Sequence, residues 1–473
     1  MKCGVVILFV FFSATKTLSA FSVLPNKHAG ITNSFVLSDA PRISSLTSLG
    51  VIVDANKVDI TEGIERDVST MEQWAGDYGI QRAPGLGLFM QDNQDGIADD
   101  YSVYTTEPLQ VGSTVVLVPN QMFLTSYQAP QEFGSALEEA EGELSDAVQE
   151  YHTSKKPEEV IAIFRLYVKI LSEYEKGVDS PWFPWLNSLP RRFNNGAAMT
   201  SACFECLLPY AAELSMTERT TSVNFQKCAE LLQYAGVLQE ATVVDVDLLK
   251  WAYSVASTRS FIIPGTGGEL VIAPLADYFN HGAEPEVEYQ FDEEFNLMMY
   301  TTTDVPAGSP LRLSLGDPTN PSPLFATYGF LDESSPATFS KIMDKETEME
   351  ELMFDKSKLL FYKDSGDISP QVWDLLLYAY LKEEDYDTSQ DFYQAVMAED
   401  EAAKFEYHQQ YFSYTLEALR EHVDGTLQSL EELSIKAMGK DLSTHPRIPV
   451  ILKHNDFVKE TFLQVQANIY SMM

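Results

Sequence analysis

The residues best suited to chemistry lie in the segment LADYFNH, which contains Asp277, Asn280 and His281. A carboxylate, an amide and an imidazole can hold a ligand through hydrogen bonds, and the imidazole can also accept a proton. The same residue types suit a turn, because short polar side chains hydrogen-bond nearby backbone groups. A strand-like run precedes the segment at 269–274 and another follows at 286–291. A ligand site and an ordinary turn between two strands are therefore both open.

Three other short motifs carry residues of possible function, and each is weak evidence alone. Gly85-Leu86-Gly87 is a pattern that usually marks a turn, although glycines also let a ligand approach the backbone. The segment TRSF offers a cation at Arg259, which on its own is most simply a solvated charge. The segment TYGF offers a phenol at Tyr328.

Together and in this order, the motifs resemble those of SET-domain protein methyltransferases. The subgroup with the best resemblance is the one named for the Rubisco large-subunit lysine methyltransferase. The resembling elements are GLGL at 85–88, WFPWLNSLP at 182–190, TRSF at 258–261, PLADYFNH at 274–281 and TYGF at 327–330. They fall within roughly residues 68–460. The resemblance implies a protein-lysine N-methyltransferase that uses S-adenosylmethionine and recognises its substrate with a C-terminal helical domain.

The resemblance also implies roles for individual residues. One set would bind the cofactor: the backbone at the glycines approaches it, the arginine pairs with its carboxylate, the asparagine holds its methionine part, and the backbone at the histidine reads its adenine. This set is Gly85, Leu86, Gly87, Arg259, Phe261, Asp277, Asn280 and His281. Tyr328 would be the catalytic residue and, with Phe261, would supply aromatic walls of the site. Since methyl transfer is an in-line displacement, the main tasks of the protein are positioning and exclusion of water.

One position departs from the family pattern. The stretch LRLSLGDPTN places Leu315 where the family carries a channel tyrosine, thirteen residues before Tyr328. Leucine supplies packing but no hydrogen bond, and losing one such polar contact costs about 10²-fold or more in rate. Two readings therefore stand: a lysine methyltransferase, and a catalytically silent SET-fold protein that serves as a binding module or scaffold.

The elements that must position these residues follow from periodicity. Apolar residues recur at three- and four-residue spacing between about 132 and 256 and again from about 340, which predicts helices. Short β-branched and alternating runs, among them Val115 to Val118 and EVEYQF at 286–291, predict strands. Ser369-Pro370 predicts a helix start with a serine N-cap. Strands interrupted by helices and followed by a helical block imply two domains, the first of them α+β. The resemblance implies that these are a SET domain at 65–335 with a helical insert at about 132–256, and an all-α substrate-recognition domain at 340–473.

Charge restricts the partners. The 473 residues carry a formal net charge of −38, which repels nucleic-acid phosphates and anionic membrane surfaces. Such a surface attracts a basic, lysine-bearing protein segment, although it also serves solubility alone. After the N-terminal run, no stretch is apolar for about 18 residues, so we expect no membrane span in the mature protein. The sequence does not indicate an oligomeric state.

The N-terminus predicts targeting. Residues 1–20 have the lysine, apolar run and small residues of a signal peptide. Residues 21–50 are rich in serine and threonine and poor in acids, as transit peptides are. The junction SAFSVLP resembles presequences for complex plastids, which predicts a plastid location; simple secretion is the alternative.

Two remaining patterns have a simple and a specific interpretation. Cys203 and Cys206 are expected to be core thiols, and half of a zinc site is the alternative. The acidic loop at 91–101 is expected to be a solvated insertion, since Gln91 and Ser102 stand where a calcium loop needs acids.

Overall fold

The structure is a computed structural model that describes residues 56–90, 101–150, 155–339 and 345–473. The predicted targeting segments and nearly all of the acidic loop lie outside these residues. The described residues belong to one compact unit. Within them, no helix combines the length and the apolar character needed to cross a membrane.

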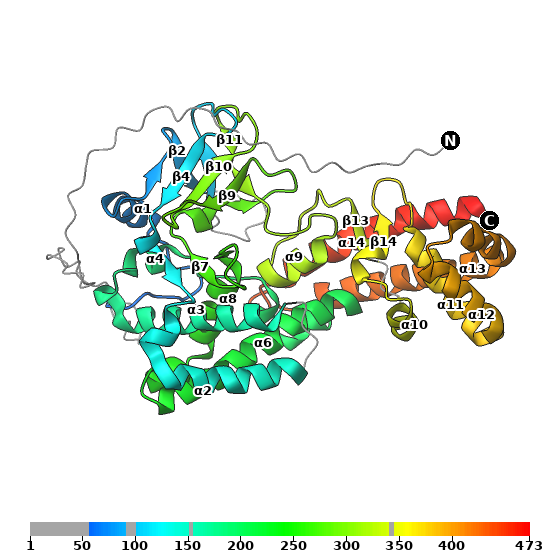
Figure 1. Cartoon of the computed structure of the whole chain (residues 1–473), viewed down its shortest axis with the longest axis horizontal. Helices are drawn as coiled ribbons and strands as arrows, with labels where there is room; N and C mark the ends of the chain where they lie inside the picture. The colour runs from blue at the N-terminus through cyan, green and yellow to red at the C-terminus, as the bar shows by residue number, and fades with distance from the viewer. Residues whose placement is uncertain (1–55, 91–100, 151–154, 340–344) are drawn as a thin grey trace. The chain divides into compact units, whose positions relative to one another are not determined.

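Short strands include residues of three of the site motifs, GLGL, TRSF and PLADYFNH (Figure 1). One sheet has the order β1-β4-β10-β9, built from Gln81–Arg82, Thr114–Val118, Leu297–Thr301 and Val287–Phe291. A second has the order β11-β3-β2, built from Ser309–Pro310, Tyr101–Thr105 and Leu86–Met90. A third has the order β5-β7-β6, built from Leu124–Thr125, Leu270–Ile272 and Ser260–Ile262. Two-stranded pairs join β8 (Asn280–His281) to β12 (Arg312–Leu313), and β13 (Ala337–Phe339) to β14 (Leu360–Tyr362).

The predicted strands are confirmed, and so is their sidedness. In β9, Val287 is buried and Tyr289 and Phe291 are half-buried, whereas Glu288 and Gln290 between them are exposed. This alternation follows from the two-residue period of a strand with one face against the core. Strand β4 pairs with β1 on one side and β10 on the other, so its valines lie in the interior.

A helical region interrupts the strands, as the periodicity predicts. Its α-helices are α2 (Ala129–Glu150), α3 (Pro157–Lys176), α4 (Phe183–Ser188), α5 (Ser201–Phe204), α6 (Pro209–Tyr234), α7 (Glu240–Val243) and α8 (Val246–Thr258). Helix α1 (Val68–Asp77) precedes the region. The proline- and tryptophan-rich segment at 180–190 contains α4, with Pro184 in the first turn. Proline is tolerated there because the first turn needs no intrahelical N–H bond from it.

Helices dominate the chain after α9 (Pro321–Tyr328). They are α10 (Glu346–Glu351), α11 (Pro370–Glu384), α12 (Tyr386–Met397), α13 (Glu401–Met438) and α14 (Ile448–Met472). The predicted start of α11 is confirmed, but the Ser369 side chain does not cap it. Its hydroxyl instead donates to the Lys358 carbonyl at 2.6 Å and accepts from the Leu360 N–H at 2.9 Å. Tertiary contact with β14 therefore replaces the local cap.

Candidate functional site

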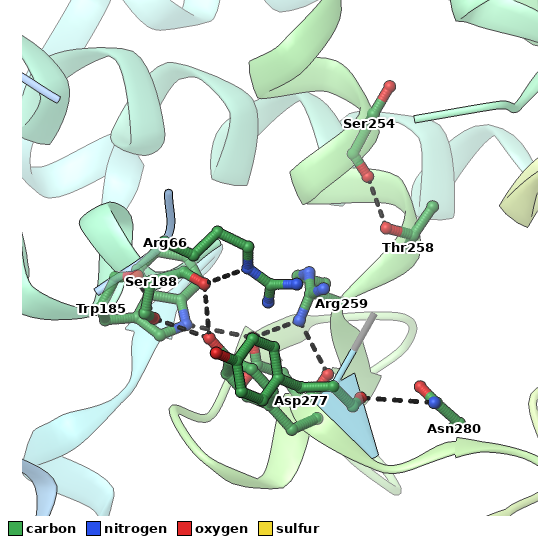
Figure 2. Close-up of polar contacts among 10 residues, drawn as sticks. Arg66, Trp185, Ser188, Ser254, Thr258, Arg259, Asp277 and Asn280 are labelled. Atoms are coloured by element: carbon green, nitrogen blue, oxygen red, sulfur yellow. Dashed lines mark hydrogen bonds and ion pairs between the residues drawn. The ribbon is translucent and has the colours of Figure 1, made fainter. Parts of the chain in front are cut away.

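A buried ion pair forms the centre of the candidate site (Figure 2). Arg259, the C-cap residue that follows α8, donates from Nη1 to Asp277 Oδ2 at 3.1 Å and to the Asp277 carbonyl at 3.0 Å. Trp185 in α4 donates from Nε1 to the same carboxylate oxygen at 3.0 Å. The pair thus joins the TRSF, PLADYFNH and WFPWLNSLP segments. Trp185 in the last segment is fully buried.

The Arg259–Asp277 ion pair is almost fully removed from solvent. The Asp277 side chain is 0% exposed and the Arg259 side chain 11% exposed. Burial raises the pKa of Asp277 above its ordinary value, although Arg259 and Trp185 act in the opposite direction. Asp277 Oδ1 and Arg259 Nε are both buried and make no hydrogen bond. One acceptor and one donor are therefore left over in a cluster that already contains both signs of charge.

Asn280 attaches the PLADYFNH segment to the sheet that contains the glycines. Its Nδ2 donates to Ser102 Oγ at 2.7 Å, and Ser102 lies in β3. In the β2–β3 ladder, Ser102 pairs with Phe89 and Gly87 pairs with Tyr104. A ladder spacing of about 4.8 Å and a rise of about 3.4 Å per residue put the α-carbons of Ser102 and Gly87 about 8 Å apart. Asn280 and Gly87 thus lie close enough to face one small molecule.

Gly85 and Gly87 differ in what a side chain would meet at each position. Gly85 has φ +75°, and a Cβ there would lie 2.7 Å from Thr106 Oγ1, so the turn itself requires glycine. A Cβ on Gly87 would lie 3.1 Å from the ring of Phe89. Phe89 is exposed, so the space beside Gly87 is covered by a movable side chain. Leu86 between them is buried in the core. The cofactor roles assigned to the three residues stay predictions.

His281 does not lie in a turn, and that alternative is wrong for the pair Asn280–His281. Both residues form β8, which pairs in parallel with β12, so that Asn280 is opposite Arg312 and His281 opposite Leu313. The turn precedes them as a 3-10 helix at Ala276–Tyr278. Parallel pairing between segments about thirty residues apart depends on tertiary structure, and no local pattern reveals it.

The imidazole of His281 uses both of its nitrogens. Nδ1 accepts from the Leu315 N–H at 3.1 Å, which assigns the proton to Nε2, and Nε2 lies 3.1 Å from Asp332 Oδ2. Burial lowers the pKa of His281 below its ordinary value, Asp332 raises it, and Arg312 lowers it further. A neutral ring held at both ends positions the backbone of Leu315, and it has no nitrogen left to act as a base.

Tyr328 and Leu315 lie together. The Tyr328 hydroxyl is 3.4 Å from the Leu315 carbonyl, a long distance for a hydroxyl donor. Burial raises the pKa of Tyr328 to about 12, and the nearby carboxylates of Glu218 and Glu159 contribute in the same direction. The phenol is therefore protonated at neutral pH. Leu315 packs, half-buried, against the hydrophobic core.

Phe261, a predicted cofactor-binding residue, packs in the hydrophobic core. It is buried in β6, and its ring meets that of Tyr289 edge to face, with centroids 5.1 Å apart. The structure brings it into the core formed with β9, while Arg259, two residues earlier, faces Asp277. An aromatic wall for a cofactor at Phe261 stays a prediction.

Sequence reasoning missed three partners of the site: Trp185, Ser102 and Asp332. Ser102 and Asp332 carry no sequence signal, because each is one polar residue in a loop-like or strand-like context. The prediction that Cys203 and Cys206 are core thiols is confirmed, since both are free thiols in buried positions, and Cys228 is a further buried free thiol. Cys206 Sγ lies 3.2 Å from the Ala202 carbonyl.

Comparison with known proteins supports the fold. No family model matches the chain, and no curated protein matches it. Among solved structures, Rubisco LSMT bound to AdoMet has a TM-score of 0.55 and 16% identity. The SET domain of LSMT bound to lysine and AdoHcy has a TM-score of 0.56, and the form bound to methyllysine and AdoHcy 0.57, each at 15% identity. Each alignment covers 86% of this chain and 92% of the other.

Sequence identity this low shows a shared fold and leaves the chemistry open. The likeness extends over both the strands that hold the motifs and the helices around and after them. The expected α+β class is confirmed: the chain has the SET fold, with helices inserted among its short sheets and a large helical C-terminal region.

Proposed function

We propose that this protein is a protein-lysine N-methyltransferase that uses S-adenosylmethionine. The observation that carries the proposal is the convergence, within a SET fold, of motifs separated by about 200 residues. Asn280 bonds to the strand beside Gly87, Arg259 pairs with Asp277, and the Tyr328 hydroxyl reaches the backbone of Leu315. A shared fold alone would not require these residues to meet.

The residues fit the proposed cofactor. The amino-acid end of S-adenosylmethionine is a zwitterion, and the buried Arg259–Asp277 pair offers both signs of charge together with one unpartnered donor and one unpartnered acceptor. Arg259 would hold the carboxylate and Asn280 the neighbouring polar groups. The bound cofactor would supply the sulfonium methyl group. Because Asp277 already neutralises part of the charge of Arg259, the arginine would act mainly through directed N–H groups.

The chain's own contribution would be positioning. The protonated Tyr328 donates a hydrogen bond, so it can orient the electron-rich groups around the incoming amine without removing a proton. His281 holds the amide of Leu315 and thereby the end of β12 next to that hydroxyl. The relatives' structures include lysine and methyllysine complexes, which supports a lysine side chain as the acceptor.

A second candidate function is a silent SET-fold binding module. The observation in its favour is Leu315, whose side chain has no polar atom at the position where the resemblance expects a tyrosine. Its backbone is engaged by both His281 and Tyr328, but a backbone carbonyl cannot donate a hydrogen bond. We further propose a plastid location, on the strength of the N-terminal sequence alone.

Calorimetry with S-adenosylmethionine, followed by transfer of a labelled methyl group to proteins of a plastid or cell extract, tests the proposal. The unmutated protein should bind the cofactor. Arg259→Ala should weaken binding by about 1.5–3 kcal/mol, the worth of hydrogen bonds to a charged group. Arg82→Ala, which removes an arginine paired with Glu72 on the surface, is the matched control and should bind normally. Absence of cofactor binding by the unmutated protein would refute the methyltransferase; binding without transfer favours the silent module.

A further inference from the structure

The carboxylate of Glu218 lies at the junction of three helices. It belongs to α6, which packs against both α8 and α9 (Figure 1). The Glu218 side chain is 6% exposed, so the carboxylate is almost fully removed from solvent. Arg259 follows the last residue of α8, and Tyr328 is the last residue of α9. The two helices that meet Glu218 therefore lead directly to a predicted cofactor-binding residue and to the predicted catalytic residue.

Three side chains from separate segments bond to this carboxylate. Tyr253 in α8 donates from its hydroxyl to Glu218 Oε2 at 2.7 Å, and Thr327 in α9 donates from Oγ1 to Oε1 at 3.1 Å. Lys155 forms an ion pair with the same Oε1. Hydrogen bonds to an ionised acceptor are about twice as strong as those between neutral groups. One buried charge in α6 thus links α8 to α9.

Net stability does not explain why a carboxylate occupies this junction. Taking both charges of the Lys155–Glu218 pair out of water costs free energy that their attraction returns only in part, so apolar side chains of similar size would stabilise the fold as well. The carboxylate does restrict geometry, because moving α8 or α9 away from it would leave a buried charge short of a hydrogen bond. The relative placement of the two helices is what it fixes.

A second contact joins the same two helix ends. Asn195 donates from Nδ2 to Ser254 Oγ in α8 at 3.2 Å. Gly329 caps α9 with φ +82°, and a Cβ there would lie 2.4 Å from the carbonyl carbon of Asn194. Figure 2 shows Ser254 and Arg259 along the same end of α8. The end of α9 therefore lies directly against a backbone segment that also bonds to α8, which leaves little room for a shift of either helix.

We propose that Glu218 is a positioning residue: its carboxylate fixes the ends of α8 and α9 relative to each other, and with them the separation of Arg259, which would hold the cofactor, and Tyr328, which would orient the acceptor amine. The proposal rests on the proposed function, since a transfer between two bound molecules needs these side chains at a fixed separation. Methyl transfer in line depends steeply on alignment, and a displacement of about 1 Å costs about 10²-fold in rate. Glu218 acts through Tyr253 and Thr327 and takes no part in the chemistry itself.

Hydrogen–deuterium exchange of the full chain, followed by mass spectrometry of peptides from the ends of α8 and α9, tests the positioning. Glu218→Gln keeps the size of the side chain and removes its charge. We expect amides at both helix ends to exchange at least about tenfold faster in this variant, because weaker bonds to the acceptor lower the cost of local opening. Glu173→Gln is the matched control, since Glu173 is also buried in the helical insert, where it bonds to Lys176 and Ser180. It should change exchange at the ends of α8 and α9 less than about twofold.

Two variants that each remove one bond separate the helices. Tyr253→Phe removes the bond from α8 and should accelerate exchange at the end of α8 more than at the end of α9, and Thr327→Val should do the reverse. Unchanged exchange in Glu218→Gln, or equal acceleration by Glu173→Gln, overturns the proposal. Should Glu218→Gln fail to fold, the two single-bond variants decide in its place, and no local acceleration by either overturns the proposal.

Kinetics connect the positioning to the reaction. With an extract protein that the unmutated enzyme methylates, Glu218→Gln should lower kcat about tenfold or more, whereas Glu173→Gln should change it less than about twofold. An unchanged kcat in a Glu218→Gln protein whose helix ends exchange faster would overturn the positioning role. If the unmutated protein transfers no methyl group, the proposed function fails instead, and the exchange pattern still decides whether Glu218 holds the two helix ends together.

Discussion

Removal of Arg259 should expose how much the fold depends on the buried ion pair. In the Arg259→Ala variant, the Asp277 side chain keeps the Trp185 N–H as a partner but loses its cation, and that side chain is 0% exposed. Breaking a buried pair by removing one partner costs about 3–5 kcal/mol, because the remaining charge is uncompensated. The variant should therefore be much less stable at neutral pH.

Protonation of Asp277 limits the loss of stability in the Arg259→Ala variant. An ordinary aspartate has a pKa of about 3.9, so at about pH 7 neutralising it costs about 1.36 kcal/mol for each of about three pH units, or about 4 kcal/mol. Asp277 already has a raised pKa because of its burial, and losing Arg259 raises it further. A raised carboxyl pKa stabilises the folded state least at high pH. The loss should thus shrink to about 1.5 kcal/mol near pH 5.

Urea unfolding followed by tryptophan fluorescence, at about pH 7 and about pH 5, measures this dependence. Arg259→Ala/Asp277→Asn should recover at least half of the loss, because the neutral amide can still accept from Trp185. Arg82→Ala should cost less than about 1 kcal/mol, as exposed pairs do. A loss below about 1 kcal/mol for Arg259→Ala, or the same loss at both pH values, would show that Arg259 does not compensate the Asp277 charge.

The remaining predictions concern the hydroxyl beside Leu315 and one buried histidine. Leu315→Tyr should raise methyl transfer in the labelled-donor assay, whereas Leu315→Phe, which adds the ring without the hydroxyl, should not; equal effects would make the hydroxyl irrelevant. Tyr328→Phe should lower transfer about 10²-fold but change the free energy of unfolding by less than about 1 kcal/mol, since its hydrogen bond is long. Burial lowers the pKa of His454 to about 4, so its contribution to stability is complete above about pH 6.5 and is lost, by up to about 3 kcal/mol, as the pH falls toward 4. His454→Asn should flatten that part of the pH–stability curve, and an unchanged curve would assign it to other groups.

Hydrophobic periodicity along the sequence was sufficient to predict many of the helices and strands. The alternation in 286–291 predicts β9 and the side of it that is buried, and the helical periodicity predicts the long helices of the insert and the C-terminal region. These predictions succeed because the signal is local: a two- or 3.6-residue period reports which face of an element meets the core. The buried thiols follow in the same way from an apolar helical context.

By itself, the sequence determined the class of fold and the order of the motifs, because both depend on the residue types at successive positions of the chain. Only the tertiary structure decided which motif residues touch. It pairs Arg259 with Asp277 and Trp185. It places Asn280 and His281 in a strand rather than a turn, and it buries Phe261 in the core. The Ser369 side chain does not cap α11. Each of these outcomes is set by a partner that lies in another segment, and the desolvation of a charge or the pairing of a strand depends on that partner rather than on the neighbouring sequence.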